Sequence, residues 1–543
     1  MSTHKNSNRA IRLPLYIALT LCLGVFIGAN MAGTNSSPAS DFLQNLSKFR
    51  QVLTHIENDY VDEVDSDELV ESAITNMLEE LDPHTSYIPA KDLKLIQSRL
   101  QGNYEGIGVE FNIFKDTIQV VSPLSGGPSE KLGIRAGDRI VKVDGEIVAG
   151  IGITNQKVVE LLRGPGGSVV TVSIKRSGET DLINFDIERD VIPQYSVDVS
   201  YMVDDEIGYV KIARFANSTY LEFKEALLKL QDKGMKKLVI DLTGNPGGYL
   251  NRAVQIVDEV LGGRQMIVYT DGKEKRYIEE HYSGEQGDFE VGSLVIMVDE
   301  GSASASEIVA GAVQDHDRGL IVGRRSFGKG LVQLPIDLND GSELRLTISR
   351  YYTPSGRSIQ KTYTGGNLDE YYKEAYERYE NGELYSSDSI KFNDSLAYKT
   401  DKGRIVYGGG GITPDFFVPL DTSQNTRYMN RLFSTNSLQE YTVTYAQENS
   451  ESLIEMGFEK YRSSFQVTDK MLNNLVKIAE GNKLKFDEKE FLRSKELIRL
   501  LTKAYIARGI WDNDGFYPIF NEQDEIFLKA IQLMDEADKI AQR

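Results

Sequence analysis

Several residue types that carry common protein chemistry are scarce in this sequence of 543 residues. It has one cysteine, Cys22, and five histidines, none of which forms an H-E-x-x-H motif or any other close pair. A single thiol can neither close a disulfide nor build a thiolate zinc site, and isolated histidines do not make a metal centre. The sequence therefore predicts no metal ion, no cofactor and no disulfide framework.

Basic residues are also in deficit. The 61 Lys and Arg residues face 81 Asp and Glu residues, which gives a formal net charge of -20 spread along the chain. Such a field repels phosphate backbones, so nucleic acid is excluded as an expected partner. Apolar residues make up 40% and charged residues 26% of the chain, a composition typical of folded proteins, and this length predicts about three or four domains.

No acidic residue precedes Asp41. Lys5, Arg9 and Arg12 stand before a largely apolar run, residues 13–32, and this order is typical of a secretory signal peptide or an uncleaved signal anchor over residues 1–33. We therefore expect an exported, periplasmic protein. Cleavage would release it, whereas retention would tether it to the cytoplasmic membrane, and the sequence leaves both outcomes open.

The residue pattern then changes three times along the chain. Apolar residues recur at helical spacing in residues 41–100, where a helix is expected from a Ser66 cap to Leu81. Short strands and glycine turns follow in 101–188, strands alternate with helices in 189–420, and residues 421–543 are mostly helical, with helices expected at 469–480, 487–508 and 521–541. The expected fold is a multidomain α/β protein with a helical N-terminal region and a helical C-terminal extension.

The segment 101–188 resembles a PDZ domain of the circularly permuted kind found in bacterial proteases. In PDZ domains, the turn equivalent to Gly106, Ile107, Gly108 and Val109 offers backbone N–H groups to a peptide carboxylate while the peptide adds as a strand. Taken alone, the same turn could be a plain hairpin with no ligand. Arg163 follows a predicted helix, where it could either respond to peptide occupancy or only close the helix end.

A serine and a lysine in the α/β region could form a nucleophile and its base. Ser304 stands where a loop is expected to enter a helix, and Lys329 lies between Gly328 and Gly330 among apolar residues. Lysine is a base only when neutral, so its pKa must fall from about 10.4 towards 7 or 8, a shift that burial can supply at a cost of about 4 kcal/mol. This pattern indicates acyl transfer.

Acyl transfer also needs backbone donors for the developing oxyanion. The first N–H groups of a helix are unpaired, so the N–H of Ala305 can face that charge. A second donor is expected from Gly247 or Gly248, in a glycine turn that follows a predicted strand at 237–242. Ser302 and Ser306 are interpreted as loop and helix-cap residues.

These residues belong to a longer pattern that resembles the carboxy-terminal processing, or tail-specific, serine proteases. Lys329 follows Ser304 by 25 residues (329 - 304 = 25), and Gln333 follows the lysine by four (333 - 329 = 4), as in that family. Further segments resemble family motifs in the same order: Leu81–His84, Gly106–Gly108, Leu162–Gly164, Asp241–Gly248, Tyr352–Arg357 and Gly411–Asp415. The resemblance covers about residues 42–420, with residues 361–402 as an insertion, and leaves out the C-terminal extension.

The resemblance implies a crotonase-like ββα protease core, residues 189–420, with an inserted PDZ domain. It further implies that Ser304 is the nucleophile, Lys329 the general base and Gln333 the residue that orients the lysine. The implied substrates are proteins or peptides with apolar C-terminal tails, captured by the PDZ domain. Homo-oligomerisation, and gating of the active site by the PDZ domain, are left open.

Three rival functions also fit parts of the sequence. Gly323 and Gly328-Lys329 fit a phosphate-binding loop, but Gly330 replaces the required Ser or Thr, and a strand is expected next. Ser326 and Lys329 fit the S-x-x-K of penicillin-recognising enzymes, but glycines flank the lysine where those enzymes need a helix. A catalytically silent PDZ scaffold, in which the serine loop only caps a helix, remains the main alternative.

Overall fold

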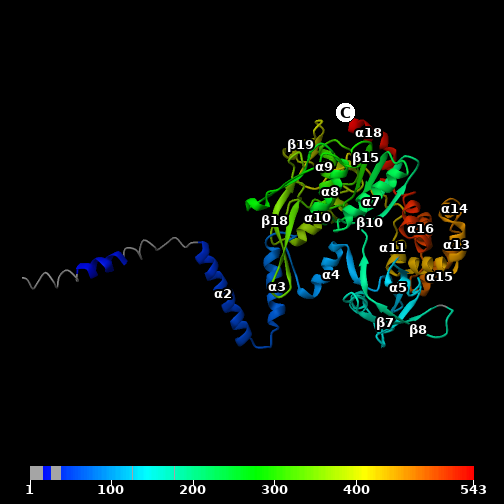
Figure 1. Ribbon diagram of the computed structural model, residues 1–543, viewed down its shortest axis with the longest axis horizontal. Helices are drawn as coiled ribbons and strands as arrows, with labels where there is room; N and C mark the ends of the chain where they lie inside the picture. The colour runs from blue at the N-terminus through cyan, green and yellow to red at the C-terminus, as the bar shows by residue number, and fades with distance from the viewer. Residues whose placement is uncertain (1–15, 26–37, 125, 177, 543) are drawn as a thin grey trace, which may run out of the picture. The chain divides into compact units, whose positions relative to one another are not determined.

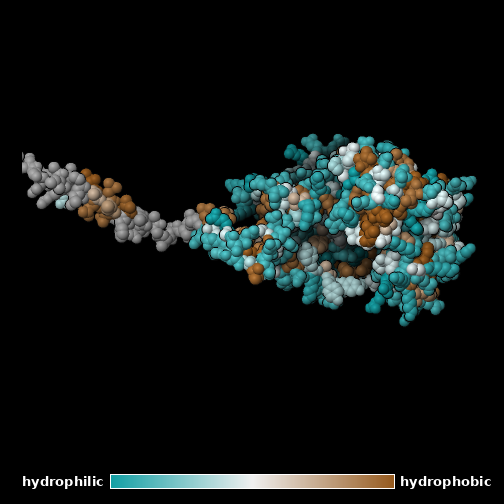
Figure 2. Space-filling view, turned by 90° about the horizontal axis from the view of Figure 1, so that it is seen from below, coloured by the Kyte–Doolittle hydropathy of each residue, from teal (hydrophilic) through white to brown (hydrophobic). Residues whose placement is uncertain are grey.

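The computed structural model describes residues 16–25, 38–124, 126–176 and 178–542. Most of the predicted leader, including Lys5, Arg9 and Arg12, lies outside these residues. Its described part, 16–25, is helical and exposed, and Figure 2 shows it as a mostly hydrophobic stretch. Within the described residues, no helix is both long and apolar enough to cross a bilayer. The chain divides into two compact units, Met1–Met77 and Leu78–Arg543.

The first unit contains α2 (Pro38–Asp59) and most of α3 (Ser66–Glu79). The prediction that Ser66 caps α3 is wrong. Asp65 takes that role, because its Oδ1 accepts the N–H groups of Asp67 at 3.0 Å and Glu68 at 3.1 Å. The Ser66 hydroxyl donates instead to the carboxylate of Glu57.

The PDZ-like region is built on a sheet in the order β3-β4-β5-β7-β8, with β6 paired to β5. Alternate strand residues point to the same face, so Ile118, Val120 and Val172 are fully buried in one apolar cluster. β2 (Asn103–Gly106) pairs antiparallel with β9 (Asp190–Pro193), which brings the two ends of the region together. The other elements are β3 (Val109–Phe114), β4 (Thr117–Pro123), α5 (Pro128–Lys131), β5 (Arg139–Val143), β6 (Glu146–Ile147), α6 (Asn155–Leu162), β7 (Val169–Lys175) and β8 (Ile183–Glu188).

The α/β core has a six-stranded sheet in the order β10-β11-β12-β15-β16-β21, antiparallel at β10–β11 and parallel elsewhere. Its strands are β10 (Val197–Met202), β11 (Ile207–Ile212), β12 (Lys237–Asp241), β15 (Ser293–Val298), β16 (Leu320–Gly323) and β21 (Phe416–Phe417). Helices cover both faces (Figure 1), so every residue of β11, β15 and β16 is buried. One face packs on α7 (Thr219–Asp232), α8 (Leu250–Val260) and α9 (Ala305–Asp315), and the other on α17 (Glu525–Gln532) and α18 (Met534–Gln542).

A second sheet of the core has the order β1-β18-β13-β14, and β17 also pairs with β18. Its strands are β1 (Ser86–Ile88), β13 (Met266–Gly272), β14 (Glu280–Tyr282), β17 (Leu331–Asp337) and β18 (Glu343–Tyr352). β1 follows the Leu81–His84 motif, and β17 follows the loop that carries Lys329. Pairing of both strands with β18 brings these two segments to the same part of the core. α4 (Ala90–Gln101) follows β1.

The insertion and the C-terminal extension are the remaining parts. The insertion contains α10 (Leu368–Glu380) and β19 (Ala397–Lys399), which pairs with β20 (Ile405–Tyr407). The extension contains α11 (Arg427–Ser434), α12 (Ser437–Glu448), α13 (Ser450–Met456), α14 (Phe458–Ser464), α15 (Asp469–Gly481) and α16 (Glu488–Phe520). The predicted helix 487–508 is longer than expected and kinks at Trp511–Asp512. The helix predicted at 521–541 begins at Glu525, after an Asp524 cap that accepts a 2.7 Å bond from the N–H of Phe527, and it is interrupted at Leu533, so that α17 and α18 are separate helices.

Candidate active site

Ser304 lies between β15 and α9, at the point where the loop 299–303 becomes a helix. Its φ of 56° and ψ of -112° place a non-glycine residue in a strained conformation of the kind that active sites retain. The residue lines a cavity of about 740 Å³ together with Lys329, Gln333, Gly247 and Gly248. The structure therefore gathers around one cavity every predicted catalytic and oxyanion residue except Ala305, which directly follows Ser304.

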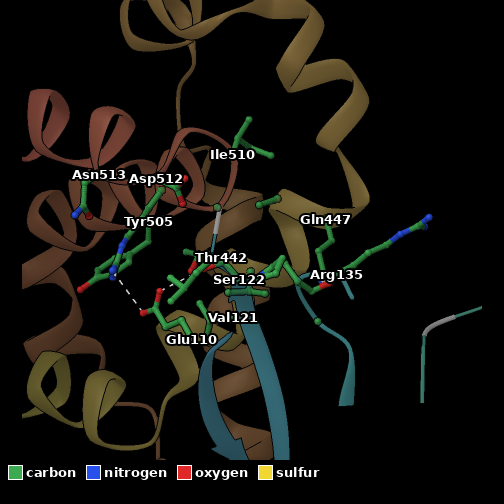
Figure 3. Close-up of a pocket in the computed structure, with 18 of the residues that line it drawn as sticks. Glu110, Val121, Ser122, Arg135, Thr442, Gln447, Tyr505, Ile510, Asp512 and Asn513 are labelled. Atoms are coloured by element: carbon green, nitrogen blue, oxygen red, sulfur yellow. Dashed lines mark hydrogen bonds and ion pairs between the residues drawn. The ribbon is translucent and has the colours of Figure 1, made fainter. Parts of the chain in front are cut away.

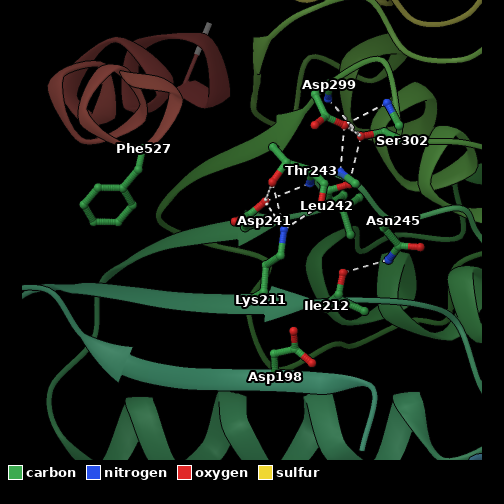
Figure 4. A network of polar contacts seen from close by, with 12 residues as sticks. Asp198, Lys211, Ile212, Asp241, Leu242, Thr243, Asn245, Asp299, Ser302 and Phe527 are labelled. Carbon is green, nitrogen blue, oxygen red and sulfur yellow. Dashed lines mark hydrogen bonds and ion pairs between the residues drawn. The ribbon is translucent and has the colours of Figure 1, made fainter. Parts of the chain in front are cut away.

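The loop before Ser304 is fixed by a polar network (Figure 4). The Ser302 hydroxyl donates to the Leu242 carbonyl at 2.8 Å, and the Gly244 N–H donates to Asp299 Oδ1 at 2.7 Å. Both contacts join the β15–α9 loop to the turn that follows β12. The Ser302 hydroxyl is thus buried and hydrogen-bonded, in keeping with the interpretation of Ser302 as a loop residue.

The same turn holds the start of α9. The N–H of Ala303 donates to the Asn245 carbonyl at 2.9 Å, and the Ser306 hydroxyl donates to that carbonyl at 3.0 Å. Ser306 is completely buried. Its hydroxyl is committed to the backbone, which leaves Ser304 as the serine of this loop that faces the cavity.

The glycine turn leaves only one of the two N–H groups expected as oxyanion donors without a partner. Gly247 already donates its N–H to Asn245 Oδ1 at 2.9 Å, so its predicted role as a donor is not supported. Its φ of +95° and the absence of a side chain let the turn approach Ser304, because a Cβ there would lie 2.7 Å from the Cβ of Ser304. Within the described residues, the N–H groups of Gly248 and Ala305 have no protein partner.

Lys329 lies in the loop between β16 and β17. Burial lowers the pKa of its ammonium group, and the nearby charge of Glu307 opposes that shift. The Tyr351 hydroxyl lies 2.5 Å from the Lys329 carbonyl and 3.0 Å from the Ser304 carbonyl, so one side chain bridges the backbones of both residues. General-base catalysis needs a lysine with a lowered pKa in the same cavity as the serine, and Lys329 and Ser304 meet this condition.

Glu307, for which the sequence pattern predicted no role, joins the serine loop to the lysine loop. Its fully buried carboxylate accepts the N–H of Ser304 at 2.8 Å, the N–H of Lys329 at 2.9 Å and the N–H of Gly328 at 2.7 Å. It also accepts the Ser326 hydroxyl at 2.6 Å. Four donors on one carboxylate favour its ionised form, although burial raises its pKa to about 7.

We expect Glu307→Gln to lower kcat about 10- to 100-fold while the protein stays folded. The amide would present an NH₂ group to donors that need an acceptor, and this mismatch would loosen the register between the serine and lysine loops. The measurement is kcat and KM on a peptide substrate, with Glu300→Gln as the control because Glu300 bonds to Arg324 outside the cavity. An unchanged kcat in Glu307→Gln would contradict a role for this bridge.

Gln333 lines the cavity but is bonded elsewhere. Within the described residues, its amide donates to the Thr347 hydroxyl at 3.4 Å rather than contacting the Lys329 amine. Thr347 donates in turn to Asp82 at 3.1 Å, which ties the Leu81–His84 motif to this wall of the site. The orienting role of Gln333 therefore stays a prediction.

The predicted peptide-binding turn lies between β2 and β3. Within the described residues, the N–H groups of Ile107 and Gly108 have no backbone partner, and Gly108 has a φ of +69°. β3, which begins at Val109, is an edge strand of its sheet and can therefore accept an added peptide strand. Gly106 ends β2 and pairs with Asp190.

Arg163 ends α6 and reaches the core. Its guanidinium donates to the Ser98 hydroxyl at 3.1 Å and lies 4.3 Å from the centre of the Tyr104 ring. Ser98 belongs to α4, and the neighbouring residues Gln97 and Leu100 line the cavity that holds Ser304. Arg163 thus links the PDZ-like region to α4, the helix that contributes Gln97 and Leu100 to the cavity that holds Ser304.

A larger cavity, of about 940 Å³, lies between the β3–β4 hairpin and the C-terminal helices (Figure 3). Glu110 and Arg508 form an ion pair of 3.5 Å across it, and Gln447 donates to the Ala136 carbonyl. It contains neither Ser304 nor Lys329. The smaller cavity is therefore the candidate active site.

The described residues also bear on the rival functions. Ser326, the serine of the S-x-x-K pattern, is completely buried and donates to Glu307, so it cannot meet a substrate. Lys329 is followed by strand β17 rather than by the helix of a phosphate-binding loop. In the described part of the chain, no group of three or more His, Cys, Asp or Glu side chains could hold a metal ion.

Comparison with known proteins gives four family matches. A sequence model of peptidase family S41 matches residues 206–371, and a PDZ domain model matches residues 119–176. The N-terminal domain of the activating protease CtpB matches residues 28–92, and a family of unknown function, DUF8443, matches residues 428–512. These matches lie on the core, the PDZ-like region, the N-terminal helices and the C-terminal helices.

Individual relatives match over longer stretches. A carboxy-terminal-processing protease of Bartonella bacilliformis is 37% identical over 346 residues, 62% of this chain and 78% of its own length. A probable CtpA-like serine protease of Staphylococcus haemolyticus is 30% identical over 495 residues, 87% of this chain and 96% of its own length. Among solved structures, a photosystem II D1 C-terminal processing protease is 30% identical over 57% of this chain and 83% of its own length, with a TM-score of 0.33.

Proposed function

This chain belongs to the carboxy-terminal processing proteases of peptidase family S41, and from that premise we propose that it is an exported endopeptidase with a Ser304–Lys329 dyad. Its substrates are proteins or peptides whose apolar C-terminal tails are captured by the PDZ domain. The family match to a serine-type peptidase and the PDZ match support the coarse activity. The Ser304–Lys329 dyad, the acyl-enzyme intermediate and export are the parts of this function that we propose.

The reaction would run through two acyl transfers. The neutral amine of Lys329 takes the proton of the Ser304 hydroxyl as its oxygen attacks the peptide carbonyl carbon. The N–H groups of Gly248 and Ala305 hold the oxyanion, and its collapse breaks the C–N bond while Lys329 protonates the leaving amine. Water then attacks the Ser304 ester, with Lys329 as base, and releases the new carboxyl terminus. Gln333 would steady the lysine from the same cavity.

One observation carries this proposal: Ser304 and Lys329 line one cavity, and Glu307 bonds to the backbone N–H of both. A silent PDZ scaffold has no need of a strained serine beside a buried lysine.

The PDZ domain would select the free end of the substrate. The N–H groups of Ile107 and Gly108 would receive the terminal carboxylate, and residues upstream would pair with the edge of β3. Binding of the tail would be transmitted by Arg163, through Ser98 on α4, to the wall of the catalytic cavity. This link supports gating of the active site by the PDZ domain.

The test is a matched pair of peptides with the same apolar C-terminal sequence, one a free acid and one an amide. We expect kcat/KM for the amide to fall about tenfold or more, because a neutral amide cannot accept charge-assisted bonds from the turn. A fluorophosphonate, which labels activated serines, should mark Ser304 in the same preparation. Equal turnover of both peptides would contradict tail capture, and absence of the label would contradict the nucleophile.

Export, membrane tethering and self-association also remain proposals. The leader at residues 1–33 supports export, and N-terminal sequencing of the mature protein distinguishes a cleaved signal from a retained tether. On α2, Phe42, Leu46 and Phe49 are exposed apolar residues at helical spacing, which supports association with a second copy. The mass of the full chain in solution tests this point.

A further inference from the structure

The insertion 361–402 contributes a helix, α10, that contacts the catalytic lysine loop. Two residues of α10 are buried, Tyr371 and Arg378, and they are seven positions apart on one helical face. Tyr372, Tyr376 and Tyr379 on the same helix are exposed. The buried face therefore identifies what α10 packs against.

Arg378 packs against the backbone of the loop that leads to Lys329. Its guanidinium donates to the Ser326 carbonyl at 3.1 Å and to the Arg325 carbonyl at 2.6 Å. A third bond, of 2.9 Å, runs to Glu383, which also holds Arg325 at 2.6 Å. The planar fork of an arginine suits two adjacent carbonyls, and a lysine ammonium would not reproduce this geometry.

Tyr371 packs against the side chain that precedes Gly328 in the same loop. Its ring meets Phe327 edge-on, with the centroids 6.2 Å apart, and its hydroxyl lies 2.8 Å from His84 Nε2. Lys361, at the start of the insertion, places its amine 4.0 Å from the Tyr371 ring and 4.4 Å from the Phe327 ring. An aromatic layer therefore covers the loop that precedes Lys329.

The start of the insertion also bonds to the lysine loop and to α10. The N–H of Lys361 donates to the Gly328 carbonyl at 3.0 Å, directly beside Lys329. Its amine also bonds to the Tyr371 carbonyl at 3.1 Å and to Glu374 at 3.0 Å, so the start of the insertion and α10 are held together. The carbonyls of residues 325, 326 and 328 are thus all bonded to the insertion or its edge.

We propose that α10 is a positioning element for the catalytic base: Arg378 and Tyr371 hold the 325–328 loop against the core, and this contact keeps the Lys329 amine out of water. Neither residue touches the cavity that holds Ser304, so both would act through the loop. The inference rests on the proposed role of Lys329 for its functional meaning. The contact between α10 and the loop stands without that role.

The charged and titratable groups around this contact form two sets. Glu307, Arg345, Asp82 and His84 interact electrostatically with Lys329, and Glu383, Arg325, Glu374 and Lys361 surround Arg378. Burial, followed by the charge of Lys329, lowers the pKa of His84 to about 4. His84 therefore stays neutral over the range in which Lys329 is studied. Glu307 is the group whose titration must be separated from that of Lys329.

The first experiment measures Lys329 without relying on activity. In the full chain carrying Ser304→Ala, the acylation rate of Lys329 by acetic anhydride is followed against pH by peptide mass spectrometry, with exposed Lys373 as the internal control. Loosening the loop with Arg378→Lys should hydrate the Lys329 amine. The pH at which its acylation rate is half-maximal should then rise by about one unit, whereas the acylation profile of Lys373 should not change. Arg378→Lys keeps a positive charge beside Glu383 but loses the fork, so it favours a folded variant.

The second experiment uses the Ser304 enzyme. Arg378→Lys should move the acid limb of the kcat profile to higher pH and lower kcat about tenfold at neutral pH, with KM for the tail peptide unchanged. Tyr371→Phe should give a smaller shift in the same direction, and Tyr376→Phe, an exposed neighbour, should give none. Glu307→Gln combined with Arg378→Lys removes the titration of Glu307, and the shift should persist.

The outcomes separate cleanly. A Lys329 acylation profile that is unchanged in folded Arg378→Lys and Tyr371→Phe overturns the inference, as does a loss of activity that follows only the loss of folded protein. If Lys329→Met were to retain turnover, the proposed base would be wrong, yet the acylation profile would still decide whether α10 controls the loop. A shift in the acylation profile with no shift in kcat would also overturn α10 as a positioning element for catalysis.

Discussion

Replacing Ser304 with alanine should abolish turnover of a peptide with a free, apolar C-terminus, with kcat falling about 10⁴-fold or more. No other serine of the loop can substitute. Ser302 and Ser306 are buried and donate to backbone carbonyls, so neither hydroxyl is free to attack. The fold should survive, because the Ser304 N–H, rather than its hydroxyl, makes the bond to Glu307.

The matched controls are Ser302→Ala and Ser306→Ala. Each removes one hydroxyl bond and should cost about 1 kcal/mol of unfolding free energy while leaving turnover within a few-fold of the parent. Turnover is measured on purified protein by mass spectrometry of the cleaved tail, and stability by urea unfolding. Persistent cleavage by folded Ser304→Ala would mean that another group is the nucleophile.

Replacing Lys329 with methionine should cause a loss of similar size, because the methionine side chain fills similar space without a base. Lys329→Arg should be equally inactive, since the guanidinium stays protonated and cannot accept a proton. In the parent enzyme only the neutral amine acts, so activity should rise with pH as Lys329 deprotonates. Burial lowers its pKa, which places that rise below the range of an ordinary lysine.

The pH profile carries a second contribution in the same direction. Glu307, with a pKa raised to about 7 by burial, must be ionised to accept all its donors, so activity should also be lost as it protonates. Lys373→Met, an exposed lysine on α10, is the control and should leave the profile unchanged. A kcat that is flat from acid to alkaline pH would contradict a titrating lysine base.

The sequence predicted the candidate site best through the spacing between its residues. The 25-residue separation of Ser304 and Lys329 predicted two residues that the structure places in one cavity. Gly247 shows the limit of this reasoning. A glycine turn can be recognised from sequence, but which N–H stays unpaired depends on the Asn245 side chain, whose amide oxygen accepts the Gly247 N–H.

Glu307 could have been found. Ser304 and Glu307 have the S-x-x-E spacing of a capping box, in which the glutamate bonds back to the N–H of the first residue. Its further bonds to Gly328 and Lys329 join segments 21 and 22 residues away, which local patterns do not encode. The contacts of α10 are of the same kind, because Arg378 recognises backbone carbonyls and these carry no sequence signal.

The predicted starts of two helices were wrong for a local reason. Ser66 and Asp65 are both good caps, and the aspartate one position earlier is the residue that bonds to the N–H groups of α3. The same preference for an aspartate cap starts the last predicted helix at Glu525, after Asp524, rather than at residue 521. Periodicity therefore predicted where helices lie better than where they begin.

The most direct test of the Ser304–Lys329 dyad is to trap the covalent intermediate. The full chain is mixed with an activated ester of an apolar tail peptide, quenched in acid within its first turnover and digested for mass spectrometry. The account predicts one acyl group on the peptide that contains Ser304, at a rate that rises with pH and is lost in Lys329→Met. An acyl group on a different residue, or unchanged acylation of Ser304 in Lys329→Met, would contradict it.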